Sequence, residues 1–362
     1  MTAGWRALSR LGLRPRVLVL VDLVQDIDVL LPLLVQLDTA GFCALRIRVS
    51  RWLETESPRT AALLRANALR FHYVRRNEVT AGRAPSLAGV AAVLTASEST
   101  HPAHAAGHAL ARRARAAGLR TYVLQHGLEN VGLFGWEAKA ATFASEAIFC
   151  WFPAASIPSD LDPATAAKLV HVGRCTPRGG WRRTGGKPFD LGVFENLHWD
   201  RYSDTDRESF RLGLLAAGGA KPPIRILVRP HPAGGWGDGI SHELAQFPNI
   251  TPALAAAGRT GVASGVDLLQ GVRRVITTPS TIALDAALAG VQVAVATDGG
   301  AVYAPLQQVR TPQDWTVFAS GRMDDPLALD QFRSRVLVEG DAAPRIVERL
   351  HGDLVAHLGR NV

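Results

Sequence analysis

The chain has few cysteines, few lysines and no long uninterrupted apolar segment. The cysteines show neither the even count of a disulfide framework nor the spacing of a metal site; they are Cys43, Cys150 and Cys175. The longest apolar candidate, residues 17–37, is broken by aspartates at positions 22, 26 and 28, which argues against a secretory leader or a spanning helix. We therefore expect a protein of the reducing cytoplasm.

Basic residues outnumber acidic ones by 40 to 32, and only four of the basic ones are lysine. The arginines are spread along the chain together with many alanines and glycines, so we interpret them as a compositional bias on a solvated surface rather than a nucleic-acid groove. The sequence contains no RNP-like or zinc-finger pattern, and nucleic acid is not an expected partner. The charge would instead favour an anionic nucleotide donor or an acceptor at a membrane surface, with peripheral attachment to its inner face.

With 362 residues, 47% of them apolar, the chain is longer than a single core usually supports. Apolar runs of strand length alternate with helical patterns in both halves, which predicts an α/β fold of two doubly wound Rossmann-like domains. Expected strands in the first half are 16–21, 44–49, 71–74, 89–94, 121–124, 147–151 and 169–172, with helices around 29–37, 60–69 and 102–117. Expected strands in the second half are 191–194, 224–228, 275–277 and 292–296, with helices around 203–217, 266–271 and 280–289.

A polar segment rich in glycine and arginine separates the two halves and cannot bury enough apolar surface to form an element. We therefore predict a first domain at 1–175, a linker at 176–189 and a second domain at 190–340. A last helix within 341–362 is expected to pack back across the interdomain cleft.

Two expected strands of the second half end in residues suited to phosphate. The strand 224–228 leads into Arg229-Pro230-His231-Pro232, and the strand 275–277 leads into Thr278-Pro279-Ser280-Thr281 at a helix start. In open parallel sheets, ligands bind outside the carboxyl ends of the strands. A guanidinium, an imidazole, hydroxyls and the N–H groups of a helix start all bind phosphate oxygens, so this half is predicted to bind a nucleotide.

Three more side chains belong to this predicted donor site. Asp285 lies one turn after Thr281, and Asn196 and His198 follow the first strand of the second half. Four residues of the predicted donor site also have a structural alternative. These are a packing histidine for His231, a surface ion pair for Arg229, an N-cap for Ser280 and a solvated helix carboxylate for Asp285.

The first half is expected to supply the catalytic base and the acceptor site. Asp22, Glu98 and His126 each follow a predicted strand, and either a carboxylate or a near-neutral imidazole can deprotonate a hydroxyl. The alternatives are a helix-capping aspartate and a packing histidine. Histidines at 101, 104 and 108 superficially suggest a metal site, but no zinc signature is present, and we predict neither a metal nor another cofactor.

The chain resembles bacterial capsule and surface-polysaccharide transferases of the GT-B fold, including sialyltransferases, capsule Kdo transferases and CDP-glycerol glycerophosphotransferases. The resemblance is carried by Arg229-Pro230-His231-Pro232, by Thr278-Pro279-Ser280-Thr281 with Asp285, and by Leu124-Gln125-His126-Gly127. It implies that His231 and the Ser280-Thr281 pair contact the nucleotide phosphates and that Asp285 accepts the ribose hydroxyls. The hydroxyl pair is often two adjacent serines in that group, and here it is Ser280-Thr281 after a proline.

The resemblance implies a glycosyltransferase that moves a sugar or polyol phosphate from a nucleotide-activated donor, linked to CMP or CDP, to a saccharide or lipid-linked acceptor. Two other functions stay open. A UDP-sugar 2-epimerase has the same two-domain fold and would release UDP with no acceptor present. A non-catalytic scaffold of this fold would bind a nucleotide sugar without turnover.

Overall fold

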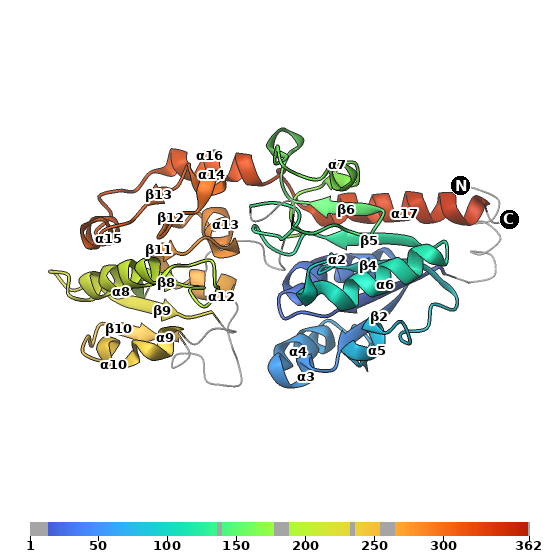
Figure 1. Ribbon diagram of the computed structural model, residues 1–362, viewed down its shortest axis with the longest axis horizontal. Helices are drawn as coiled ribbons and strands as arrows, with labels where there is room; N and C mark the ends of the chain where they lie inside the picture. The colour runs from blue at the N-terminus through green and yellow to red at the C-terminus, as the bar shows by residue number, and fades with distance from the viewer. Residues whose placement is uncertain (1–13, 136–139, 177–187, 232–235, 254–264, 361–362) are drawn as a thin grey trace. The chain divides into compact units, whose positions relative to one another are not determined.

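The computed structural model describes residues 14–135, 140–176, 188–231, 236–253 and 265–360. The chain forms two compact units, one of Met1–Gly180 with Leu337–Val362 and the other of Trp181–Val336. The predicted linker at 176–189 falls for the most part outside the described residues. The residues after 336 return to the first unit (Figure 1).

The first unit is built on a seven-stranded parallel sheet in the order β3-β2-β1-β4-β5-β6-β7. Its first strand in the chain, β1, lies inside the sheet and is a run of valine and leucine in which every residue after Arg16 is buried, as expected where helices cover both faces of a parallel sheet. The strands are β1 (Arg16–Val21), β2 (Ala44–Ser50), β3 (Phe71–Val74), β4 (Val90–Thr95), β5 (Arg120–Leu124), β6 (Ala147–Cys150) and β7 (Leu169–His171).

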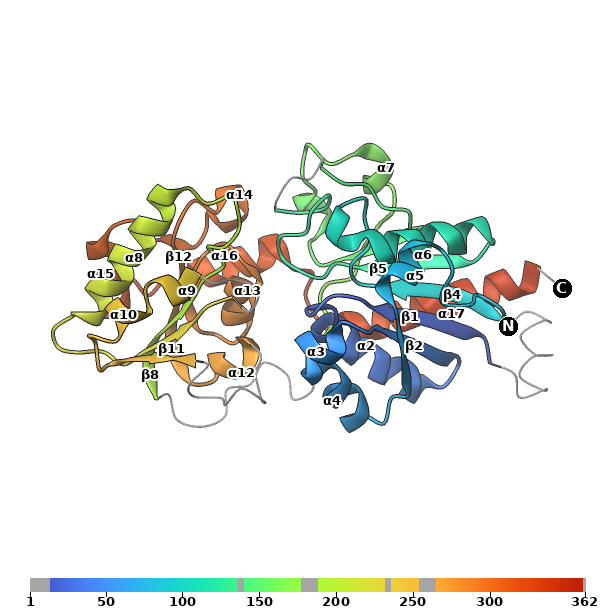
Figure 2. The same cartoon turned by 60° about the horizontal axis from the view of Figure 1, so that its bottom comes forward.

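Helices cover this sheet on both sides (Figure 2). One side carries α2 (Asp26–Ala40), which contacts α4 (Pro58–Ala66) and the last helix, α17 (Ala342–Arg360). The other side carries α5 (Arg76–Thr80) and α6 (Ala105–Ala116). Shorter helices are α3 (Leu53–Glu56), η1 (Pro102–His104), η2 (Ala154–Ser156) and α7 (Pro163–Ala166).

The second unit is built on a six-stranded parallel sheet in the order β10-β9-β8-β11-β12-β13. Its strands are β8 (Phe189–Phe194), β9 (Ile226–Arg229), β10 (Ile250–Pro252), β11 (Val272–Thr277), β12 (Gln292–Val295) and β13 (Gln307–Gln308). Its helices are α8 (Asp204–Gly218), α9 (Trp236–Gly239), α10 (Ser241–Leu244), α12 (Gly265–Leu269), α13 (Thr281–Leu288), α14 (Gly300–Tyr303), α15 (Pro312–Ala319) and α16 (Pro326–Val336).

Both strand orders confirm the predicted doubly wound α/β fold. In each sheet the chain first builds outward on one side and then crosses to the other, so the order reverses between β1 and β4 and between β8 and β11. The loops that leave the carboxyl ends of these neighbouring strands diverge, which is where doubly wound sheets bind ligands. No helix in the described part of the chain is both long and apolar enough to cross a membrane.

Candidate functional site

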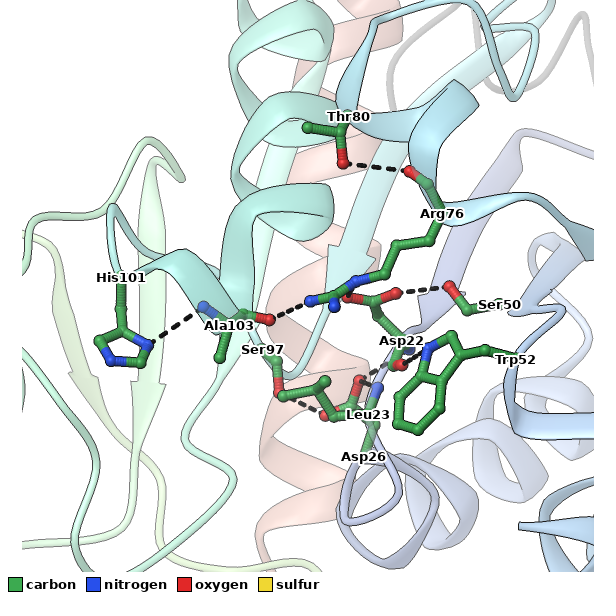
Figure 3. A network of polar contacts seen from close by, with 10 residues as sticks. All are labelled: Asp22, Leu23, Asp26, Ser50, Trp52, Arg76, Thr80, Ser97, His101 and Ala103. Atoms are coloured by element: carbon green, nitrogen blue, oxygen red, sulfur yellow. Dashed lines mark hydrogen bonds and ion pairs between the residues drawn. The ribbon is translucent and has the colours of Figure 1, made fainter. Parts of the chain in front are cut away.

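The ends of β1 and β4 are joined by a buried carboxylate, Asp26 (Figure 3). One of its oxygens accepts hydrogen bonds from the backbone N–H groups of Asp22, at 2.8 Å, and Leu23, at 2.9 Å. The Ser97 hydroxyl, just after β4, donates to the other oxygen. Burial raises the pKa of Asp26 to about 7, against these hydrogen bonds, which stabilise the charged form. Asp26 therefore fixes the loop that follows β1.

Asp22, a predicted base, lies in the same buried network. Its carboxylate accepts a hydrogen bond from the Ser50 hydroxyl at the end of β2 and forms an ion pair with Arg76, whose Nε lies 3.1 Å away. The Arg76 guanidinium also donates to the carbonyl of Ala103, and the Trp52 indole donates to the carbonyl of Asp22 at 2.9 Å. Burial raises the pKa of Asp22, while Ser50 and Arg76 act to lower it.

Glu98, the second predicted base, is buried with both carboxylate oxygens in use. The backbone N–H groups of Ala144 and Ser145 donate to them at 2.9 and 3.1 Å, and His108 on α6 lies 2.7 Å from one of them. The side chain thus ties the loop after β4 to α6 and to residues 144–145. This arrangement favours a positioning role for Glu98 over proton transfer.

His126, the third predicted base, follows β5 and is fixed by a backbone carbonyl. Its Nδ1 lies 3.0 Å from the carbonyl oxygen of Ala96, which can only accept, so Nδ1 carries the proton and Nε2 keeps its lone pair. The His104 ring meets the His126 ring edge to face at 5.1 Å. Burial lowers the pKa of His126 to about 4 and that of His104 to about 3, so both imidazoles are neutral at pH 7 and the near-neutral pKa expected for His126 is wrong.

In the second unit, Asn196 connects the loop after β8 to the loop after β11 through hydrogen bonds. Its backbone N–H donates to the Thr278 hydroxyl at 3.0 Å, its side-chain N–H donates to the Pro279 carbonyl at 3.1 Å, and its side-chain oxygen accepts from Thr278 and from the Tyr202 hydroxyl. Asn196 is therefore placed to hold the Thr278–Ser280 turn in shape.

The turn leads into α13 with Ser280 at the N-cap position, yet the Ser280 side chain makes no capping hydrogen bond. Its hydroxyl instead lies 3.0 Å from the hydroxyl of Thr277. Ser280 is thus the N-cap residue by position, as the structural alternative has it, but its side chain does not cap the helix. Asp285, on the same helix, is 5% exposed, so the alternative of a solvated carboxylate is wrong as well.

His231 and His198 meet beside this turn. Their rings stack with centroids 4.5 Å apart, and the half-exposed Trp199 ring lies edge-on to His231 at 6.5 Å. Buried Glu195 accepts from the backbone N–H of His231 at 3.2 Å and from that of Leu197 at 2.7 Å, so it joins the ends of β8 and β9. Burial, with His198 and Arg229 nearby, lowers the pKa of His231 to about 4.

Arg229 ends β9, and its guanidinium reaches Gly265 at the start of α12. A Cβ added to Gly265 would lie 2.3 Å from Cδ1 of Ile282 and 2.8 Å from Nη1 of Arg229, so a larger residue there would require both side chains to move. The buried Nδ1 of His198 has no hydrogen-bond partner in the described structure. A buried polar atom of this kind at a strand end indicates a position where a ligand would complete the hydrogen bonding.

The structure therefore places the predicted residues at the carboxyl ends of strands at or next to the strand-order reversal of each sheet. Asp22 and Glu98 follow β1 and β4, and His126 follows β5, while Asn196, His198, Arg229, His231, Ser280 and Thr281 surround the ends of β8, β9 and β11. Sequence reasoning did not identify Arg76 or Glu195 as parts of these networks. Glu195 comes directly after β8 and Arg76 two residues after β3. Their position at strand ends was the signal in the sequence that could have identified them.

In the described residues, no group of three or more histidine, cysteine, aspartate or glutamate side chains is arranged to hold a metal ion. The histidines at 101, 104 and 126 instead contact one another through their rings.

The chain matches no protein-family model and no curated protein. Its structure is similar to a putative UDP-N-acetylglucosamine 2-epimerase from Listeria monocytogenes, with a TM-score of 0.69 and 12% identity over 94% of this chain and 96% of that one. It is also similar to S. aureus MnaA in a co-structure with UDP (TM-score 0.68, 12% identity, 94% and 97% covered) and to the calicheamicin glycosyltransferase CalG4 (0.55, 13%, 96% and 99%). The chain thus has the two-unit GT-B-like fold.

Proposed function

We propose that this protein is a glycosyltransferase that takes a sugar or polyol phosphate from a nucleotide-activated donor, linked to CMP or CDP, and transfers it to a saccharide or lipid-linked acceptor. The observation that carries the proposal is the set of donors around the ends of β8, β9 and β11. His231 and Arg229 leave β9, and the Thr278–Ser280 turn leaves β11 and opens α13. Hydrogen bonds made by Asn196 and Glu195 hold these loops together.

This set suits the phosphates of a nucleotide. A neutral His231 donates one N–H group, Arg229 supplies positive charge, and the start of α13 supplies backbone N–H groups with the positive end of the helix dipole. Asp285, buried on the first turns of α13, is assigned to the ribose hydroxyls, and His198 to a phosphate or sugar oxygen. Trp199 offers an exposed aromatic face beside them for the base or the sugar.

We assign the catalytic base to His126. Its proton is held on Nδ1 by Ala96, so Nε2 is available to take a proton from an acceptor hydroxyl. Its lowered pKa keeps Nε2 unprotonated at pH 7, and Asp22 and Glu98 hold the surrounding loops through their networks. Proton transfer at His126 would accompany departure of the nucleotide, whose charge the second unit would balance.

The donor site is tested by thermal shift with CMP, CDP, UDP, GDP and ADP. A ligand that binds only the folded protein raises its melting temperature. We expect one nucleotide class to stabilise the wild type and the control His242→Ala, in which an exposed histidine of the same unit is removed, but not His231→Ala. Absence of any shift in the wild type would contradict the proposed donor site.

The second candidate is a UDP-sugar 2-epimerase, favoured by the similarity to the Listeria monocytogenes protein. The product formed without an acceptor separates the two functions. A 2-epimerase converts a UDP-sugar into its C2 epimer in the absence of an acceptor, with or without net release of UDP, whereas a transferase releases nucleotide at a significant rate only when an acceptor is added. His126→Ala should abolish turnover and leave nucleotide binding unchanged, with His72→Ala on β3 as an exposed control. Unchanged turnover in His126→Ala would contradict the base assignment.

A further inference from the structure

A basic cavity of about 440 Å³ lies in the first unit beside β2 and β3. Four arginines contribute to its wall: Arg46 and Arg48 on β2, Arg51 just after β2, and Arg75 just after β3. Glu78 on α5 is the acidic residue that lines it. The donor site described above, in the second unit, does not account for this concentration of positive charge.

The charges of this cavity are poorly balanced. Among the described residues, Glu78 pairs only with Arg75, at 3.8 Å, and both side chains are exposed to solvent. Within the described part of the chain, Arg46, Arg48 and Arg51 form no ion pair with an acidic side chain. Three guanidinium groups therefore face one cavity with a single carboxylate that is already engaged.

Two of these arginines are built into the sheet. Arg46 and Arg48 are two residues apart on β2, so they point to the same face, and both are half-buried. The guanidinium of Arg46 donates to the Ala88 carbonyl at 3.1 Å, and that of Arg48 donates to the Ile47 carbonyl at 3.2 Å. Burial and the nearby Arg46 lower the pKa of Arg48, as expected for two like charges held close together. An anion bound between them would relieve this repulsion.

The lining of the cavity and the network around Asp22 draw on the same two strand ends, those of β2 and β3. Ser50 and Arg76, which both bond Asp22, are the sequence neighbours of Arg51 and Arg75. Anything bound in the cavity would therefore lie beside the loops that carry the proposed acceptor site.

We propose that this arginine-lined cavity binds a diphosphate group of the acceptor substrate. The proposal rests on the proposed transferase function and names the chemical class of its acceptor. Guanidinium groups bind phosphate oxygens in paired hydrogen bonds, and a diphosphate carries enough negative charge to balance three unpaired arginines, which a single carboxylate does not. The volume of the cavity is within the range of small-ligand sites.

The test measures binding of inorganic pyrophosphate to the full-length protein by calorimetry. The variants are Arg46→Gln/Arg48→Gln, the donor-site variant His231→Ala, and Arg112→Gln as an exposed arginine control on α6. We expect the double variant to weaken pyrophosphate binding in this cavity at least about tenfold, since two charge-assisted hydrogen bonds are lost, and Arg112→Gln to bind like the wild type. Because pyrophosphate also resembles the donor phosphates, His231→Ala should lose at most a second binding event at the donor site and keep the event that the double variant loses. Equal binding by the double variant, or a loss confined to His231→Ala, would overturn the proposal.

The same variants separate this inference from the donor site. The Arg46→Gln/Arg48→Gln variant should keep the nucleotide-induced thermal shift, so a failure here leaves the test of the donor site intact. Vesicles of phosphatidylcholine with and without a few mole per cent of a polyprenyl diphosphate identify the source of the group. Retention by the diphosphate vesicles indicates a lipid-linked acceptor, and binding of free pyrophosphate without such retention indicates a soluble one. Equal retention of wild type and double variant by phosphatidylglycerol vesicles, with no pyrophosphate binding, would show surface attraction only and refute the proposal.

Discussion

The stability of the first unit should depend on pH through Asp26. Burial raises the pKa of this carboxyl from 3.8 to about 7, so between these pH values the unfolded chain releases the proton while the folded chain keeps it. The folded state then binds more protons than the unfolded state, and stability falls as pH rises across this window. A shift of about three pKa units corresponds to a contribution of about 4 kcal/mol to the free energy of unfolding. This contribution is lost by about pH 7, and the stability no longer changes through Asp26 above that pH.

The substitution Asp26→Asn removes this ionisation and keeps the shape of the side chain. The amide oxygen can still accept from the backbone N–H groups of Asp22 and Leu23, and the amide nitrogen can donate to the Ser97 hydroxyl. The difference in free energy of unfolding between wild type and variant should therefore fall by about 4 kcal/mol from pH 4 to pH 7. The difference isolates Asp26, because the lowered pKa values of His104, His126 and His231 make stability change in the opposite direction in both proteins.

Urea unfolding at several pH values, followed by circular dichroism, measures this difference. Asp28→Asn is the matched control, since Asp28 lies in the first turn of the same helix but forms an exposed ion pair with Arg59. Its difference from the wild type should stay within about 0.5 kcal/mol across the range. Parallel curves for wild type and Asp26→Asn between pH 4 and 7 would refute the reasoning.

Two further predictions concern the loops at the strand ends. Asn196→Ala should lower the free energy of unfolding of the second unit by about 3 kcal/mol, because the buried hydroxyls of Thr278 and Tyr202 lose a hydrogen-bond partner. A urea titration that shows a loss below about 1 kcal/mol would contradict this. Gly107→Ala should destabilise the first unit by about 2–3 kcal/mol, because the new Cβ would lie 2.1 Å from the Ser97 carbonyl oxygen. Gly352→Ala is the control, since this glycine lies in α17 and an added Cβ would meet no neighbouring group within 4 Å. It should stabilise the first unit by up to about 1 kcal/mol, measured by thermal unfolding. Equal effects of the two substitutions would contradict the steric argument.

The buried strands were predictable because their apolar runs are uninterrupted. The predicted strand at 16–21 coincides with β1, and the predicted strands at 147–151 and 292–296 match β6 and β12 to within one residue. The edge strands β10 and β13 were not predicted, since β10 has three residues and β13 consists of two glutamines. Short or polar edge strands carry no hydrophobic pattern, so only pairing with a neighbour reveals them.

The sequence predicted where the candidate site residues lie, but not which residues they hydrogen-bond to. Strand ends pointed to Asp22, His126, His231 and Ser280, because the edge of a parallel sheet is fixed once the strands are known. The partners of these residues are far away in sequence: Arg76 is 54 residues from Asp22, and Thr278 is 82 residues from Asn196. Hydrogen bonds over such separations depend on packing, which local patterns do not encode.

The return of the last helix to the first unit has a consequence for synthesis on the ribosome. The Tyr122 hydroxyl on β5 donates to Asp353 on α17 at 2.9 Å, across 231 residues of chain. The unit that begins first is thus the last to have all its residues outside the exit tunnel, while the second unit is complete as soon as residue 336 emerges. Until α17 itself emerges, the surface that it covers stays exposed, and a nascent chain halted before residue 342 leaves that surface open to chaperones.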